Sequence, residues 1–274
     1  MSVTYEAVLD VSEDTVLFLS GLLHAERLRR GTRAGRRKLS TYKQAVLVLR
    51  WFLDDTRMSA LARDNRISKS TAYEYRDEGV AVLAARRPTL HGALLAAKMA
   101  GHSFVIVDGT LIHTDRISIP GPTKGVDLWW SGKHKHHGGN IQVVSAPDGW
   151  PLWVSDVRPG REHDMTAARA DPELLERIAD WISEGSHALA DLGYEGAPDT
   201  FTIPFKKPKD GELTVDQQAY NAVHGALRCL GERANSLLKT TYKALRRQRG
   251  CPWRIGTIAA AALVLLHHEH ARTT

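Results

Sequence analysis

The first part of the chain places apolar residues three or four positions apart, which is the spacing of an amphipathic helix. Residues 12–30 have valine and leucine on one side between positions 16 and 23, and Ser12 stands where an N-cap would. Similar patterns predict helices at residues 41–53, 57–64 and 69–84. Arg86-Arg87-Pro88 breaks the pattern, and we interpret it as the entry to a linker. We therefore predict an all-helical domain over residues 1–95.

From Ser103 onward the pattern changes to that of an α/β domain. Phe104–Val107 is a short apolar, β-branched run that is typical of a buried strand. Ile141–Val144 and Trp150–Val154 flank Asp148-Gly149, which predicts a hairpin. The remaining predicted elements are strands at 188–190 and 201–203, and helices at 164–184 (Asp164 as N-cap, with a restart at Asp171-Pro172), 215–245 and 254–268. This order predicts a mixed sheet flanked by helices over residues 96–274.

Two aspartates follow predicted strands. Asp108 ends the run Phe104–Val107 and precedes Gly109, and Asp191 ends residues 188–190 just before Gly193. A carboxylate at the tip of a buried strand, beside a glycine, is held rigidly where backbone can approach a ligand. One such aspartate is more often a turn former, but two in one domain favour a functional site.

A third acid is found on the predicted helix 215–245. Arg228, Glu232, Asn235 and Lys239 are spaced four, three and four residues apart, so they share one stripe of the helix. Such a stripe is often a solvent-facing surface with an Arg–Glu ion pair. Its position after two strand-end aspartates favours the alternative, in which Glu232 joins Asp108 and Asp191 and the other three side chains contact DNA near the active site.

Three converging carboxylates form the hard-oxygen environment that Mg²⁺ or Mn²⁺ prefers. A pair of such ions, about 4 Å apart, can activate a water or a 3′-hydroxyl and stabilise the leaving oxygen of a phosphodiester. The same chemistry needs cations that bind phosphate. Arg228 and Lys239 are candidates, as are Lys133 and Lys135 in a basic loop rich in histidine. A histidine metal site in that loop is the less favoured alternative, because no cysteine or acid stands at ligand spacing.

Charge is distributed unevenly along the chain, whose net charge is +6. Residues 1–100 carry +6, residues 151–200 carry −7 and residues 201–274 carry +7. Basic segments around an acidic one suit a protein that binds phosphates at several points and gathers carboxylates at one. The two cysteines form no zinc or disulfide framework, so we expect a cytoplasmic, nucleoid-associated protein. The longest apolar run, residues 255–266, is too short to span a bilayer, and we expect no membrane anchor.

Five ordered motifs give the segment 100–270 a resemblance to a known family. They are Val107-Asp108-Gly109-Thr110, Gly132-Lys133-His134-Lys135, Gly160-Arg161-Glu162-His163-Asp164, Ala190-Asp191-Leu192-Gly193-Tyr194 and Gly231-Glu232-Arg233-Ala234-Asn235. Together they resemble the DDE domain of bacterial insertion-sequence transposases and their Harbinger-type relatives. The resemblance implies a ribonuclease H-like fold in which Asp108, Asp191 and Glu232 bind the metal ions.

One motif departs from the family. The family's terminal signature consists of a tyrosine, an arginine, a glutamate and a lysine, separated by two, three and six residues. Arg228, Glu232 and Lys239 fit this spacing, whereas Gly225 replaces the tyrosine. The His163-Asp164 pair recurs in the family near the active site, although Asp164 fits a helix cap equally well.

The segment 61–76 resembles a bacterial helix-turn-helix. Ala62 would let two helices cross closely, and Ser68 would cap the second helix. The residues expected to face the DNA major groove or its phosphates are Lys69, Ser70, Thr71, Tyr73 and Arg76. Arg66 occupies the turn position that usually holds glycine. Three-helix packing without DNA could produce a similar pattern.

We therefore predict a DNA transposase that binds transposon ends, hydrolyses phosphodiester bonds with Mg²⁺ or Mn²⁺ and transfers strands to target DNA. Its partner would be double-stranded DNA, on which it would act as a homo-oligomer. One alternative is a ribonuclease H-like endonuclease without strand transfer. Another is a catalytically silent helix-turn-helix regulator, which is disfavoured because all three acids are present in order.

Overall fold

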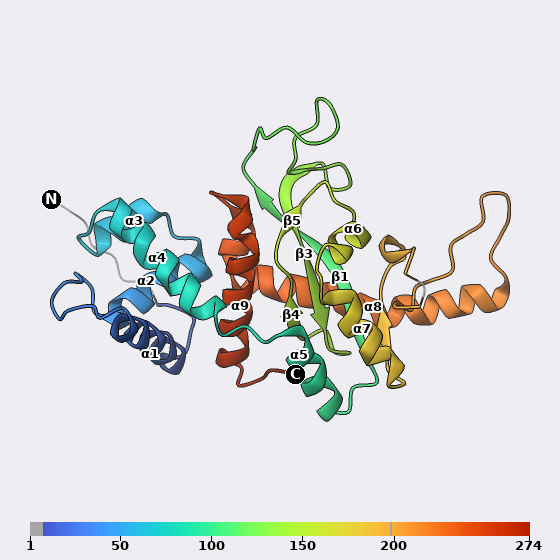
Figure 1. Cartoon of the computed structure of the whole chain (residues 1–274), viewed down its shortest axis with the longest axis horizontal. Helices are drawn as coiled ribbons and strands as arrows, with labels where there is room; N and C mark the ends of the chain where they lie inside the picture. Colours follow the sequence, from blue (N-terminus) through green and yellow to red (C-terminus); the bar gives the residue numbers. More distant parts are fainter. Residues whose placement is uncertain (1–7, 198) are drawn as a thin grey trace.

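The N-terminal part of the chain is a bundle of helices. The computed structural model describes residues 8–197 and 199–274, and its first elements are α1 (Glu13–Arg29), α2 (Thr41–Asp54), α3 (Met58–Asp64) and α4 (Lys69–Ala84) (Figure 1). These bounds agree with the predicted helices to within one residue. Serine side chains cap three of them: Ser12, Ser40 and Ser68 each accept a hydrogen bond from the backbone N–H three residues later. Local signals thus suffice to place these helices.

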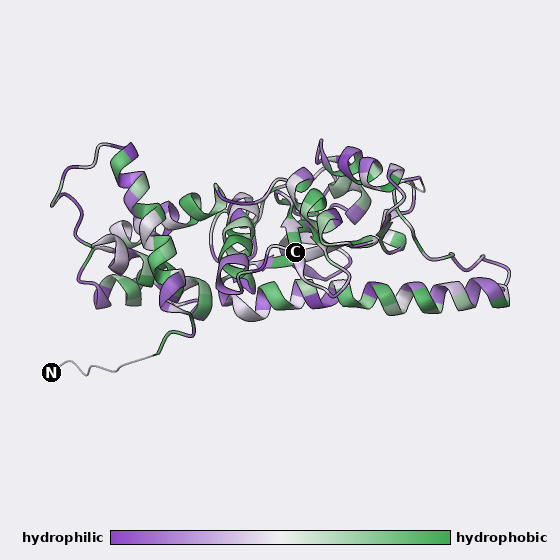
Figure 2. Cartoon of the chain, turned by 90° about the horizontal axis from the view of Figure 1, so that it is seen from below, coloured by the Kyte–Doolittle hydropathy of each residue, from purple (hydrophilic) through white to green (hydrophobic). Residues whose placement is uncertain are grey.

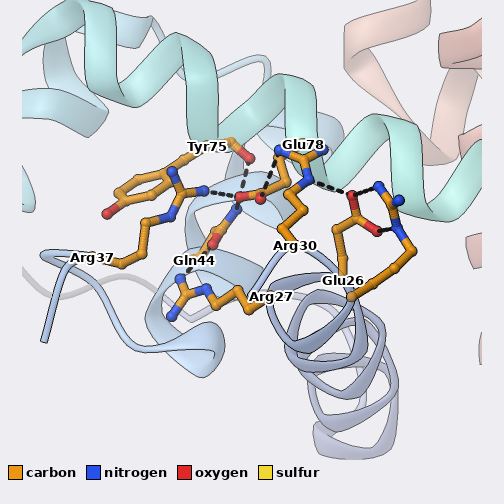
Figure 3. A network of polar contacts seen from close by, with 8 residues as sticks. Glu26, Arg27, Arg30, Arg37, Gln44, Tyr75 and Glu78 are labelled. Carbon is orange, nitrogen blue, oxygen red and sulfur yellow. Dashed lines mark hydrogen bonds and ion pairs between the residues drawn. The ribbon is translucent and has the colours of Figure 1, made fainter. Parts of the chain in front are cut away.

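A buried carboxylate, Glu78, ties the loop between α1 and α2 to α4 (Figure 3). It accepts hydrogen bonds from the Nε2 of Gln44 at 2.8 Å and from the Arg37 guanidinium. Arg30 adds a second guanidinium 3.6 Å away. The charge of Glu78 is therefore compensated within the bundle.

A short helix that the sequence pattern did not predict, α5 (Leu90–Met99), follows the Arg86-Arg87-Pro88 break. Thr89 caps it through the backbone N–H of Gly92. It packs against α7 and β4 of the second part of the molecule. The expected domain boundary at residues 95/96 falls inside α5.

A mixed sheet forms the second part. The central strand β1 (Phe104–Thr114) is antiparallel to β3 (His136–Ser145) and parallel to β6 (His187–Leu189). Shorter strands complete the sheet: β2 (Trp130–Ser131), β4 (Pro151–Val154) and β5 (Arg158–Pro159) pair with β3, and β7 (Arg247–Gln248) pairs with β1. The predicted hairpin around Asp148-Gly149 is confirmed as β3–β4.

Two predictions about strands are corrected. Asp108 does not end its strand, because Gly109, Thr110 and the apolar residues after them continue the ladder with β3 as far as His113. Phe201–Ile203 is not a full strand among the described residues; it contributes a single bridge, between Thr202 and Leu189.

Helices cover both faces of the sheet. On one face lie α6 (Asp164–Arg169) and α7 (Leu174–Ser183), and α8 (Val215–Thr241) runs along the other (Figure 1). The first half of α8 extends past the edge of the sheet (Figure 2). The restart at Asp171 is confirmed, since its Oδ1 accepts a hydrogen bond from Leu174 N at 3.1 Å. The predicted helix 215–245 ends at Thr241, and a 3₁₀ turn covers Lys243–Leu245.

The last helix, α9 (Ile255–Glu269), lies between the helical bundle and the sheet (Figure 1). It packs against α4 on one side and β4 on the other, and most of its residues are buried. The two parts of the molecule therefore share a hydrophobic core across α9. No helix among the described residues has both the length and the apolar character needed to cross a membrane.

Candidate active site

Asp108, in the middle of β1, and Asp191, just beyond the end of the parallel strand β6, lie side by side. Ile106 on β1 pairs with Leu189 on β6, so each aspartate stands two residues beyond a paired position. Burial raises the pKa of Asp108 to about 6, and the negative charge of Asp191 adds to this effect. Asp191 is held by a 2.7 Å hydrogen bond that its Oδ1 accepts from Gly193 N. The result is a pair of carboxylates that repel one another in the absence of a cation.

The stripe of side chains predicted from helical spacing lies on α8, and its last two members, Asn235 and Lys239, face β1 at Asp108. The buried Asn235 donates a hydrogen bond from Nδ2 to Asp108 Oδ2 at 2.9 Å. Its Oδ1 is buried without a hydrogen-bond partner among the described residues. Lys239 donates to Thr110 Oγ1 at 2.6 Å and to the Leu111 carbonyl at 3.1 Å. Burial lowers the pKa of Lys239, and the charge of Asp108 partly opposes this. The ammonium is thus bound to β1 beside Asp108.

Glu232 is placed differently from the two aspartates. Its side chain is 67% exposed and lies 3.7 Å from the Arg228 guanidinium, on the turn of α8 before Asn235. Arg228 itself is close enough to Asp108 to lower that residue's pKa, against the effect of burial. Within residues 8–197 and 199–274, no three His, Cys, Asp or Glu side chains are grouped closely enough to hold a metal ion. The structure therefore brings Asp108 and Asp191 together and leaves Glu232 at the solvent side of the site.

Asp164 lies at the site, and the prediction that it caps a helix is wrong. His163 is the N-cap of α6, and no side chain caps it. The Asp164 carboxylate instead accepts hydrogen bonds from Asn140 Nδ2 at 2.9 Å and from Lys133 Nζ at 3.2 Å. Its negative charge also contributes to the raised pKa of Asp108. The His163-Asp164 pair in the sequence was the one signal that could have identified it.

The glycines beside the two catalytic candidates make room for Asp164. A Cβ on Gly109 would lie 2.1 Å from Asp164 Oδ1, and one on Gly193 would lie 3.2 Å from Asp164 Oδ2. Asp108 faces α8, whereas the next residue, Gly109, faces α6. Asp164 therefore approaches the aspartate pair from the opposite face of the sheet.

A cleft of about 220 Å³ opens beside this face. Its lining includes Thr110, Ser131, Lys133, His134, Arg161 and Asp164. Burial lowers the pKa of Lys133, but Asp164, Asp191 and Asp108 outweigh it, so the pKa is raised and the ammonium stays charged. Lys135 is exposed at the turn between β2 and β3, with φ of 56°. The sequence-predicted lysines thus lie on one hairpin, and Lys133 directly contacts the carboxylate cluster.

The second candidate interface is formed by α3, the turn after it and α4. Arg66 adopts φ of 52°, the left-handed conformation expected at this turn. Lys69, Ser70 and Tyr73 are exposed and Thr71 is half-buried. Arg76 differs from the other predicted contacts: it is 8% exposed, packs over the ring of Trp51 at 5.0 Å and pairs with Asp77 at 2.6 Å. Its guanidinium is therefore occupied inside the protein.

Comparison with known proteins places this site in a family. A family model described as DDE superfamily endonuclease matches residues 107–267, more than half of the chain. The chain is also 24% identical, over 86% of its length and 83% of the relative's, to a probable transposase for insertion sequence element IS702 from Microchaete diplosiphon.

Two solved structures show a weaker similarity. A pre-cleavage Mos1 transpososome is 10% identical with a TM-score of 0.22, covering 91% of this chain and 85% of that one. A Mos1 transposase paired-end complex with left transposon end is 11% identical with a TM-score of 0.20, covering 87% and 85%. At these values the similarity adds nothing to the fold described above. The family match confirms the resemblance found in the sequence motifs.

Proposed function

The chain belongs to the DDE superfamily endonuclease family, and we propose that it is a DNA transposase that cleaves at transposon ends and transfers strands to target DNA. The observation that carries this proposal is the half-buried pair Asp108 and Asp191, each two residues beyond paired positions of the adjacent strands β1 and β6, inside the family segment. We also propose that the mixed α/β region has the ribonuclease H-like arrangement that the family resemblance implies.

The residues at the site suit a divalent cation. Asp108 and Asp191 offer hard oxygen ligands. The Oδ1 of Asn235, which has no hydrogen-bond partner in the part of the chain that the structure describes, offers another polar atom. A cation there would offset the repulsion by Asp191 that adds to the effect of burial on the pKa of Asp108. We propose that Glu232, exposed on the same helix face, turns toward the aspartates to complete the site. Bound Mg²⁺ or Mn²⁺, as two ions, would supply an activated water or 3′-hydroxyl and stabilise the leaving oxygen.

Cationic side chains around the carboxylates would bind the DNA backbone. Arg228 is close enough to influence Asp108 and, being half-buried, can turn from Glu232 to a phosphate. Lys133 and Lys135 would approach from the β2–β3 hairpin. Asn235 and Lys239 have a different part, because their hydrogen bonds position Asp108 and the strand that carries it.

We propose that α3 and α4 act as a helix-turn-helix that recognises the transposon ends. Lys69, Ser70, Thr71 and Tyr73 are at the start of α4, where a recognition helix contacts base edges and phosphates. Arg76 is assigned to packing, in contrast to the sequence prediction, since it is buried against Trp51. Holding two DNA ends together calls for more than one copy of the chain on DNA.

A plasmid assay tests the proposal. The purified protein is incubated with Mg²⁺ or Mn²⁺, a supercoiled donor plasmid carrying the inverted repeats that flank the gene, and a target plasmid. Joined donor–target products are the expected result, and Asp108→Asn protein is the control. Nicks without joined products would instead identify an endonuclease, and uncut plasmid with both ions would overturn the proposed activity.

A further inference from the structure

A chain of buried polar side chains crosses the α6-facing side of the sheet. Tyr194 donates from its hydroxyl to Gln142 Oε1, and Gln142 donates from Nε2 to Asn140 Oδ1 at 3.2 Å. Asn140 donates from Nδ2 to Asp164 Oδ1, and Lys133 donates to Asp164 Oδ2. Asn140 and Gln142 are two residues apart on β3 and so point to the same face.

This chain is unusual for a sheet surface covered by a helix. Tyr194 and Gln142 are at most 1% exposed, and Asn140 and Asp164 are also buried. Apolar residues would fill this space without the cost of removing polar groups from water. Retention of four polar side chains, each hydrogen-bonded to the next, indicates a role beyond packing.

From Tyr194 to Asp164, each side chain donates its hydrogen bond to the next. The Tyr194 hydroxyl donates to the carbonyl oxygen of Gln142, which turns the Gln142 amide nitrogen toward Asn140. The same logic turns the Asn140 amide nitrogen toward Asp164. Asp164 therefore accepts a hydrogen bond from Asn140 on Oδ1, and its Oδ2 accepts the hydrogen bond from Lys133. The orientation of this carboxylate is set by residues deep inside the sheet.

The two ends of this series of hydrogen-bonded side chains lie at the proposed catalytic residues Asp108 and Asp191. Tyr194 follows Asp191 by three residues, and Asp164 fills the space above Gly109, next to Asp108. Lys133 is the member that reaches solvent, with its side chain 56% exposed at the cleft of about 220 Å³. A charged lysine fixed there lies at the cleft, beside the carboxylate cluster.

We propose that Asp164 is a positioning residue that, oriented by Tyr194, Gln142 and Asn140, holds the Lys133 ammonium where it binds a DNA backbone phosphate beside the aspartate pair. This inference deepens the proposed function and rests on it for the identity of the DNA substrate. Asp164 here acts through Lys133 and touches no substrate itself.

Paired substitutions test the coupling between the two residues. Asp164→Asn keeps the shape and an acceptor for Asn140 but removes the charge that holds Lys133, and Lys133→Ala removes the ammonium. Each should lower kcat/KM for cleavage of an end-bearing duplex by about tenfold, as expected for a charge-assisted contact to phosphate. The double variant should lose no more than either single one, because both remove the same contact. Lys133→Arg should retain most of the activity.

Binding supplies a readout that does not depend on cleavage. In EDTA, each single variant and the double variant should lower the salt slope of duplex binding by about one unit. The surface pair Lys98 and Glu184, in which both side chains are about half exposed, provides the matched control. Lys98→Ala and Glu184→Gln should change neither cleavage nor slope.

The outcomes separate this inference from the proposed function. Multiplicative losses in the double variant, or an unchanged slope in Lys133→Ala, would overturn the positioning role. If Asp164→Asn lowers the melting temperature by more than a few degrees while Lys133→Ala cleaves normally, Asp164 is structural and the inference fails. A wild-type protein that cuts no DNA but shows the coupled loss of slope would overturn the proposed function and retain the inference.

Discussion

Glu78 in the helical bundle is buried and Asp108 in the sheet is half-buried, yet the surroundings of these two carboxylates have opposite charge. Glu78 is met by Arg37, Arg30 and the amide of Gln44 (Figure 3). Asp108 is met by the negative charges of Asp191 and Asp164, which Arg228 and Lys133 offset only in part. The charge of Glu78 is balanced within the protein, whereas the site around Asp108 has an excess of negative charge.

The difference supports a structural role for Glu78 and the proposed functional role for Asp108. A compensated carboxylate joins helices and needs no further partner. An uncompensated one with a pKa of about 6 costs stability, and such sites are characteristic of functional centres. Removing the charge should therefore have opposite effects on stability in the two regions.

The largest expected effect is on DNA cleavage. Asp108→Asn and Asp191→Asn should each lower the cleavage rate by roughly a thousandfold or more, because each removes a metal-binding charge. Circular dichroism and binding of end DNA should remain close to wild type. Glu232→Gln should have a comparable effect if Glu232 turns toward the aspartates. Near wild-type cleavage by any one variant would remove that residue from the proposed metal site.

The next effect is on the helical bundle. Glu78→Gln should destabilise the protein by about 2 to 3 kcal/mol, since it removes a buried charge and leaves the half-buried Arg37 guanidinium without its charged partner. Urea unfolding measures the loss. Glu184→Gln, at an exposed ion pair, should stay within about 0.5 kcal/mol of wild type. Equal effects at the two positions would contradict the view that Glu78 is a buried structural charge.

A pH-dependent gain in stability is expected in the sheet. The pKa of Asp108 rises from 3.8 to about 6 in the folded protein, so between these pH values the folded state holds a proton that the unfolded chain has lost. The contribution of Asp108 to wild-type stability should therefore fall as pH rises from about 4 to 6 and stay lower above that. Asp108→Asn removes the charge, and without metal it should be more stable than wild type at neutral pH by at most about 3 kcal/mol.

The stability difference between wild type and Asp108→Asn should vanish below about pH 4, where both side chains are neutral. Adding Mg²⁺ at neutral pH should stabilise the wild type selectively, because a ligand that binds the folded state raises its stability. An Asp108→Asn protein that is less stable than wild type at neutral pH in EDTA would show that Asp108 is a structural group like Glu78.

The smallest effect concerns DNA recognition. Lys69→Ala should lower the salt slope of binding to end DNA by about one unit, and Tyr73→Ala should weaken the preference for ends over random DNA by about tenfold. Arg76→Ala should reduce stability through loss of packing on Trp51 and leave the salt slope unchanged. A reduced slope for Arg76→Ala, with the melting temperature unchanged, would show that this arginine contacts phosphate after all.

Residues whose role depends on local spacing were well predicted from the sequence. The four N-terminal helices begin and end within a residue of their expected bounds, because apolar period and serine caps act over a few residues. The α8 stripe was also predicted, since a spacing of four, three and four places side chains on one side of any helix. Asn235 and Lys239 accordingly face β1.

Contacts between distant segments could be decided only by the tertiary structure. The position of Asp164 in the sequence fits a helix cap. Its contacts with Asn140 and Lys133 exist because β3 and the β2–β3 hairpin fold against the start of α6. Arg76 shares the spacing of a DNA-contacting residue but is buried by Trp51 of another helix. The apolar run 255–266 predicts a core helix, yet only packing places it between the bundle and the sheet. Local propensity specifies which elements form, whereas which side chains meet depends on how those elements pack across long sequence separations.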